Sequence, residues 1–104
     1  MKEYNKLVRD KIPEIIRNSG KDCTIRRAED DEYYRLLQEK LSEEVKEFLD
    51  SDSPEELADI LEVMKALAST KGISWGKVES LAEEKVEERG AFSERIVLEA
   101  VFDK

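Results

Sequence analysis

Apolar residues recur every three or four positions over most of the chain, a spacing typical of amphipathic helices. In one segment, from about residue 31 to residue 50, the apolar stripe consists of Tyr34, Leu37, Leu41, Val45 and Phe48. The next segment runs from Pro54 to about residue 71, and its stripe consists of Leu57, Ile60, Leu61, Met64, Leu67 and Ala68. Because only a short polar break separates the two segments, they are predicted to form an antiparallel helix hairpin.

Shorter patterns flank this hairpin. Pro13 is suited to the first turn of a brief helix that stops at Gly20, and Ser74 can cap a last helix that stops at Gly90. Residues 96–102 are β-branched and aromatic, which favours a short strand or an extended arm packed on the body or on a partner subunit. The sequence therefore predicts one all-α domain over residues 1–104, a small helical bundle built on the hairpin with a short extended C-terminal arm.

The composition limits the size, the cellular location and the kinds of catalytic or metal site that can be expected. With 104 residues, the chain suits one small domain, for which association into at least a dimer is a plausible source of stability. It has a single cysteine, Cys23, no apolar run long enough for a membrane span, and no signal-peptide pattern at its start, so a cytoplasmic protein without membrane contact is expected. The absence of histidine excludes histidine-based triads and histidine-ligated zinc.

Charge is distributed unevenly along the chain. The net charge is -8 overall, but residues 1–27 carry +4 and residues 28–62 carry -11. This acidity argues against a nucleic-acid partner, because binding to phosphate backbones needs a basic surface. The acidic block is either a solvated helix face or a set of converging carboxylates.

Four carboxylates in the hairpin could converge. Glu44 and Glu47 stand three residues apart on one helix, and Glu56 and Asp59 do so on the next. Both pairs border the apolar stripes, and in an antiparallel hairpin the two pairs come level with each other, with about 4.5 Å between levels. Oxygen ligands without histidine or thiolate favour Mg²⁺, with Mn²⁺ as a substitute. Against this, Glu56 has a sufficient structural role in a capping box with Ser53.

Three basic side chains also stand out. Lys85 and Arg89 fall on the apolar side of the last helix, where a core-facing residue is expected, and Lys40 lies one turn before Glu44. They either snorkel outward near the helix end or serve an anionic ligand near the carboxylates. Lys6 and Arg9 either contact a substrate or offset the acidic block of a neighbouring chain.

Together these segments resemble a known family. Residues 4–16 (YNKLVRDKIPEII), 40–48 (KLSEEVKEF) and 55–62 (EELADILE), with Lys85, Arg89, Gly90 and Phe92 near the end, are similar to the all-α nucleotide pyrophosphohydrolases, which include MazG-like and phosphoribosyl-ATP pyrophosphohydrolase-like proteins. Only eight residues separate the two carboxylate pairs here, fewer than in the family's usual motif, which predicts a tight loop.

The resemblance implies a homodimer or homotetramer that hydrolyses a nucleoside triphosphate to a nucleoside monophosphate and pyrophosphate, with house-cleaning of non-standard nucleotides as the expected role. It implies that Glu44, Glu47, Glu56 and Asp59 bind Mg²⁺, and that Lys85 and Arg89 lie near the substrate phosphates. Glu47 is the favoured residue for activating water. Lys40, Lys6 and Arg9 are further candidates for substrate contact.

The same residues are compatible with two alternatives. The chain could hydrolyse phosphoribosyl-ATP in histidine biosynthesis by the same chemistry. It could instead be a non-enzymatic helical interaction module whose acidic hairpin is only a solvated surface.

Overall fold

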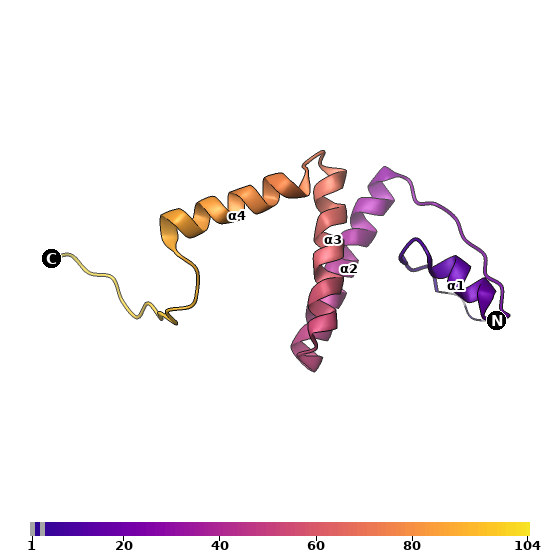
Figure 1. The fold of residues 1–104 in the computed structure, drawn as a ribbon, viewed down its shortest axis with the longest axis horizontal. Coiled ribbons are helices and arrows are strands. Elements are labelled where there is room, and N and C mark those ends of the chain that lie inside the picture. The colour runs from indigo at the N-terminus through magenta and orange to yellow at the C-terminus, as the bar shows by residue number, and fades with distance from the viewer. Residues whose placement is uncertain (1, 3) are drawn as a thin grey trace.

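The chain folds into four helices without strands over the part that the computed structural model describes, residue 2 and residues 4–104 (Figure 1). The helices are α1 (Ile12–Asn18), α2 (Asp30–Ser51), α3 (Pro54–Thr70) and α4 (Trp75–Arg89). The all-α prediction is confirmed, and the helix ends lie within a residue or two of those predicted from the apolar spacing.

α2 and α3 form the antiparallel hairpin that the sequence predicts, and they hold the core (Figure 1). The buried apolar residues in the described part of the chain are Leu37, Val63 and Ala68. At the open end of the hairpin, the Lys71 ammonium lies 4.8 Å from the centre of the Tyr34 ring, within the range of a cation–π contact. The hairpin therefore carries the four carboxylates that the sequence predicts as metal ligands.

The connection between α2 and α3 is tight. α2 ends at Ser51, Asp52 takes a left-handed conformation with φ 55°, and Ser53 caps α3 ahead of Pro54. The Ser53 hydroxyl accepts a hydrogen bond from the backbone N–H of Glu55 at 3.3 Å. The predicted capping box required the Glu56 N–H as donor; that N–H instead donates to the Ser53 carbonyl at 3.1 Å. The Ser53 N–H, from which the Glu56 side chain would accept in that box, donates to the Ser51 hydroxyl oxygen at 3.2 Å, so the Glu56 side chain is available for another role.

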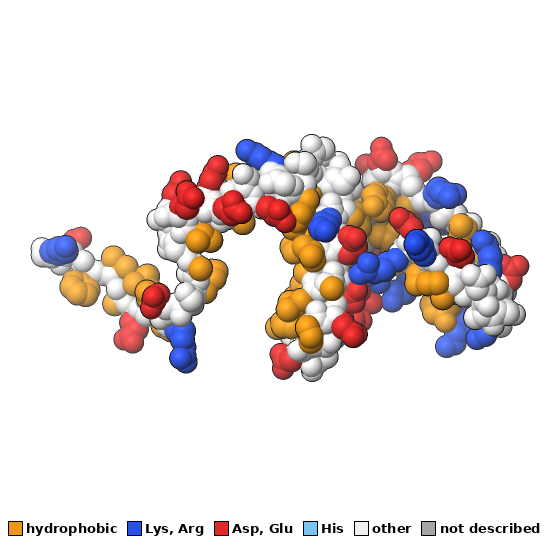
Figure 2. All heavy atoms as spheres, viewed as in Figure 1, with side chains coloured by type: hydrophobic (Ala, Val, Ile, Leu, Met, Phe, Trp, Pro, Cys, Tyr) orange, Lys and Arg blue, Asp and Glu red, His pale blue; other side chains and the backbone are white. Residues whose placement is uncertain are grey.

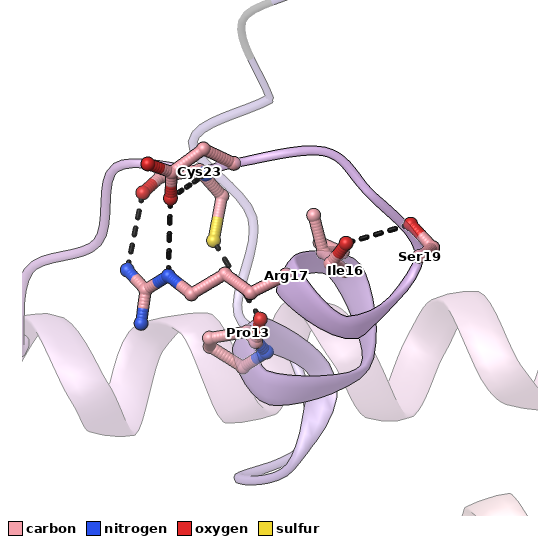
Figure 3. A network of polar contacts seen from close by, with 6 residues as sticks. Pro13, Ile16, Arg17, Ser19 and Cys23 are labelled. Carbon is pink, nitrogen blue, oxygen red and sulfur yellow. Dashed lines mark hydrogen bonds and ion pairs between the residues drawn. The ribbon is translucent and has the colours of Figure 1, made fainter.

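α1 is fastened to the loop that follows it rather than to the other helices (Figure 3). The Arg17 guanidinium donates to the Asp22 carboxylate at 3.1 Å and to the Cys23 carbonyl at 3.2 Å. The Ser19 hydroxyl donates to the Ile16 carbonyl at 2.6 Å and closes the helix. These contacts give α1 a local fold of its own beside the hairpin.

α4 and the C-terminal segment extend away from the hairpin (Figure 1). Ser74 caps α4 by accepting from the Lys77 N–H at 3.2 Å, and Gly90 ends it with φ 84°, as predicted. Residues 92–95 form a turn, in which the Arg95 N–H donates to the Phe92 carbonyl at 3.1 Å, and residues 91–104 contain no strand. The strand alternative for residues 96–102 is wrong, because an isolated segment has no neighbouring edge with which to pair.

The molecule is much longer than it is wide. Its radius of gyration is 19.0 Å, against about 13 Å for a compact chain of this length. Hydrophobic side chains gather along the inner side of the bend formed by the hairpin, α4 and the C-terminal segment (Figure 2). In the described residues, no helix combines the length and apolar character that a bilayer span requires.

Candidate metal centre

Three carboxylates from two helices converge on one point of the hairpin. Glu44 of α2 meets Glu56 and Asp59 of α3, and one oxygen from each lies within 4.8 Å of the others. The convergence follows from the tight loop and the helical period, because residues three apart share one face of α3. Three oxygen donors at this separation form a set that suits a hard divalent cation.

Glu44 is the most unusual member of this group. Its side chain is buried, with 6% of the residue's surface exposed, although most carboxylates in proteins remain in water. Oε1 lies 3.5 Å from the Lys40 ammonium, whereas Oε2 is buried without a hydrogen-bond partner. A buried carboxylate oxygen without a partner is costly, so the site is better suited to a cation than to solvent alone.

Glu56 is perturbed by the same crowding. Its Oε2 is also buried without a partner. Loss of water around the carboxyl is the main cause that raises its pKa to about 7; the negative charge of Glu47 and the closeness of the Glu44 and Asp59 carboxylates add to the effect. Near neutral pH the Glu56 carboxyl is therefore protonated for part of the time.

Glu47 lies at the edge of this group. Its side chain is exposed and is not one of the three whose oxygens lie within 4.8 Å, but it is close enough to Glu56 to raise the pKa of that carboxyl. The hairpin thus brings together three of the four expected ligands and leaves Glu47 beside them, exposed to water.

Two basic residues from the segment before α1 lie against the same face. The Arg9 guanidinium is 2.7 Å from the Asp59 carboxylate, and the Lys6 ammonium is 3.1 Å from Glu43. The hydrogen bond from Lys6 lowers the pKa of Glu43 and raises that of Lys6. Sequence reasoning did not identify Glu43; the available signal was the excess of positive charge before residue 28 and of negative charge after it.

Lys85 and Arg89 are elsewhere. α4 contacts α3 near their junction but does not reach α2, and residues 81–90 are all exposed. The expectation that these two cations point inward is therefore not met in this structure, because none of the described residues covers the apolar side of α4 beyond Val78.

A hollow at the start of α2 lies apart from the carboxylates. It is lined by Arg26, Arg27 and residues 29–32. Arg26 forms a two-pronged contact with Glu32, at 2.7 and 2.8 Å, which lowers the pKa of Glu32. Among the described residues, the carboxylates of this hollow do not form a converging set like that of Glu44, Glu56 and Asp59.

Comparison with known proteins gives one informative similarity. The chain is 53% identical over 47 residues to an uncharacterized protein of Mycolicibacterium smegmatis (strain ATCC 700084 / mc(2)155). The matched segment covers 45% of this chain and about half, 48%, of that relative. No family model and no solved structure matches the chain.

Proposed function

We propose that this protein is a Mg²⁺-dependent nucleoside triphosphate pyrophosphohydrolase, related to the MazG-like proteins, that releases a nucleoside monophosphate and pyrophosphate. The observation that supports the proposal is the buried Glu44 carboxylate, which has an unpartnered oxygen and lies beside Glu56 and Asp59. Such a donor set suits a hard cation, and Mg²⁺ in proteins commonly binds the phosphates of a substrate as well.

Glu44, Glu56 and Asp59 would hold Mg²⁺ or Mn²⁺. The cation, when bound, would neutralise negative charge on the phosphate oxygens. Its presence would also keep Glu56 deprotonated, because a positive charge nearby favours the ionised carboxyl. The proton that Glu56 binds in the free protein would be released.

Glu47 is suited to act on water because it lies beside the group and remains exposed. Its carboxylate would accept a proton as the water oxygen attacks the α-phosphorus. The bond from the α-phosphorus to the oxygen shared with the β-phosphate then breaks, and pyrophosphate leaves. One water is consumed for each triphosphate, and neither oxidant nor reductant is needed.

Binding of the β- and γ-phosphates is assigned to Lys85 and Arg89 of a second copy, with Lys40 closer to the carboxylates. This part of the proposal requires a homodimer or homotetramer. It is supported by the exposed apolar side chains of α3 and α4, among them Leu57, Leu81 and Val86, which one copy leaves uncovered. A cytoplasmic location, where such triphosphates occur, completes the proposal.

Pyrophosphate release tests the function directly. Purified protein with Mg²⁺ is incubated with standard and non-standard nucleoside triphosphates and with phosphoribosyl-ATP, and pyrophosphate and monophosphate are measured. We expect release by the wild type and a loss of at least about 100-fold in Glu47→Gln, the scale of a removed general base. Glu39→Gln, on the same helix but paired with Arg35 at 2.9 Å, is the matched control.

Release of the two products from none of these substrates would contradict the proposal and favour a non-enzymatic module. Equal activity in the wild type and Glu47→Gln would remove Glu47 from the reaction. A strong preference for phosphoribosyl-ATP would place the same chemistry in histidine biosynthesis.

A further inference from the structure

One carboxylate of the candidate metal centre already has a positively charged partner. Arg9 Nη2 lies 2.7 Å from Asp59 Oδ1, and this contact joins residues 50 positions apart. Lys6 Nζ, three residues earlier, lies 3.1 Å from Glu43 Oε1, next in sequence to Glu44. The basic segment, defined here as residues 6–9, therefore bridges α2 and α3 beside the carboxylate group.

The contacts of the basic segment are of a kind that can be exchanged. The Arg9 side chain is 56% exposed and Asp59 is 39% exposed, so water competes with their ion pair. Glu44, in contrast, is buried and keeps an oxygen without a partner. The guanidinium thus satisfies the outer carboxylate of the group and leaves the inner one unsatisfied.

A divalent cation at the three carboxylates would change this arrangement. Its positive charge would attract the Asp59 carboxylate and would repel the nearby positive charge of the Arg9 guanidinium. The Arg9 guanidinium would then be more stable beside another anion. Its planar fork of N–H donors matches a phosphate group, and it cannot lose its charge in the accessible pH range.

We propose that Arg9 and the divalent cation compete for Asp59, and that the cation, once bound, frees the Arg9 guanidinium to bind a phosphate of the substrate. The phosphate half of this proposal rests on the proposed function. It makes metal and phosphate binding cooperative, because loading of the metal exposes a phosphate ligand that is otherwise engaged.

Metal binding without nucleotide tests the first half. The full chain is titrated with Mn²⁺ alone, and the free ion is counted by electron paramagnetic resonance. Arg9→Gln should bind Mn²⁺ about two- to five-fold more tightly than the wild type, the range expected for loss of one exposed ion pair. Arg26→Gln is the matched control, because it removes an exposed arginine with an ion pair of the same 2.7 Å length, to Glu32. Its Mn²⁺ affinity should equal that of the wild type.

Binding of inorganic pyrophosphate tests the second half. With Mn²⁺ at saturation, Arg9→Gln should bind pyrophosphate at least about three-fold more weakly than the wild type, although its metal affinity is higher. Opposite changes in the two affinities are not expected of a residue that only supports the fold, since a damaged fold would weaken both.

The outcomes separate this proposal from the function on which it draws. Equal Mn²⁺ affinity in the wild type and Arg9→Gln overturns the competition, even if the wild type hydrolyses triphosphates. Tighter metal binding together with unchanged pyrophosphate binding overturns the role at the phosphate. Absence of Mn²⁺ binding by the wild type overturns the metal centre and this proposal together.

Discussion

Arg9 and Asp59 are 50 positions apart in the sequence, yet their charged groups lie 2.7 Å from each other. The contact brings the positively charged start of the chain to the negatively charged hairpin at the point where the carboxylates meet. It is an exposed ion pair, and such pairs contribute about 0.2–1 kcal/mol to stability. The contact is therefore important because it occupies the Asp59 carboxylate, and its contribution to the stability of the fold is small.

Glu44→Gln is predicted to abolish the response of the protein to divalent cations. In the wild type, Mg²⁺ at ten times its dissociation constant should stabilise the fold by about 1.4 kcal/mol, seen as a rise of several degrees in melting temperature. The variant should show no rise, because the buried donor is gone. Glu62→Gln, an exposed residue of α3, is the control and should respond as the wild type does. A full response in Glu44→Gln would mean that the cation binds elsewhere.

The stability of the metal-free protein should depend on Glu56 between pH 4.5 and pH 7. The pKa of this carboxyl is about 7 in the folded protein and 4.5 ordinarily, so the folded state binds the proton more tightly. Its contribution to stability is fully present below pH 4.5 and is lost as the pH rises toward 7. Urea midpoints measured in EDTA across this range should fall with pH, and the fall should be smaller in Glu56→Gln. A slope unchanged by the substitution would assign the dependence to other groups.

Ser53→Ala should weaken the fold by about 1 kcal/mol, because its hydroxyl accepts from the Glu55 N–H at the start of α3. Ser53→Gly should cost only a few tenths of that, since glycine is tolerated at this position. Urea unfolding followed by circular dichroism measures both. Ser42→Ala, in the exposed part of α2, provides the comparison, and a cost as large there would show that the cap is not responsible.

Light scattering coupled to size exclusion should give a mass of two or four times the 12.0 kDa of one chain. The reason is the exposed apolar surface of α3 and α4, which includes Leu61 and Val86 at 39% and 52% exposure. Leu61→Glu combined with Val86→Glu should shift the mass toward that of one chain, whereas Lys65→Glu should not. A wild-type protein of 12.0 kDa at micromolar concentration would contradict the association.

The helices were predictable because their signals are local. The apolar period gives α2 and α3, and the residues that begin and end α4, Ser74 and Gly90, act within one turn of the helix. The hairpin follows from the short break between α2 and α3, and the approach of Glu44 to Glu56 and Asp59 follows from the hairpin. These steps need no knowledge of distant contacts.

The remaining features depend on contacts between distant parts of the chain, and a local sequence pattern does not contain that information. An apolar stripe shows which side of α4 avoids water, but not what covers it, and so Lys85 and Arg89 were expected beside the carboxylates and lie on an exposed helix instead. The partner of Arg9 could not be chosen among many acidic residues by charge alone. The burial of Glu44 could not be predicted either, because a helical wheel shows the face on which a residue lies but not how exposed that residue is in the folded chain.

The loop between α2 and α3 has a consequence for how this protein can change in length. Ser51 ends one helix and Pro54 begins the next, so two residues connect them. A residue inserted within the first turn of α3 would turn everything after it by about 100° around the helix axis. An insertion before Glu56 would therefore carry Glu56 and Asp59 together away from Glu44, without any change in residue type. Homologous chains that keep both acidic pairs but differ in length between Glu47 and Glu56 can therefore have the same acidic residues and a different arrangement of their carboxylates in space.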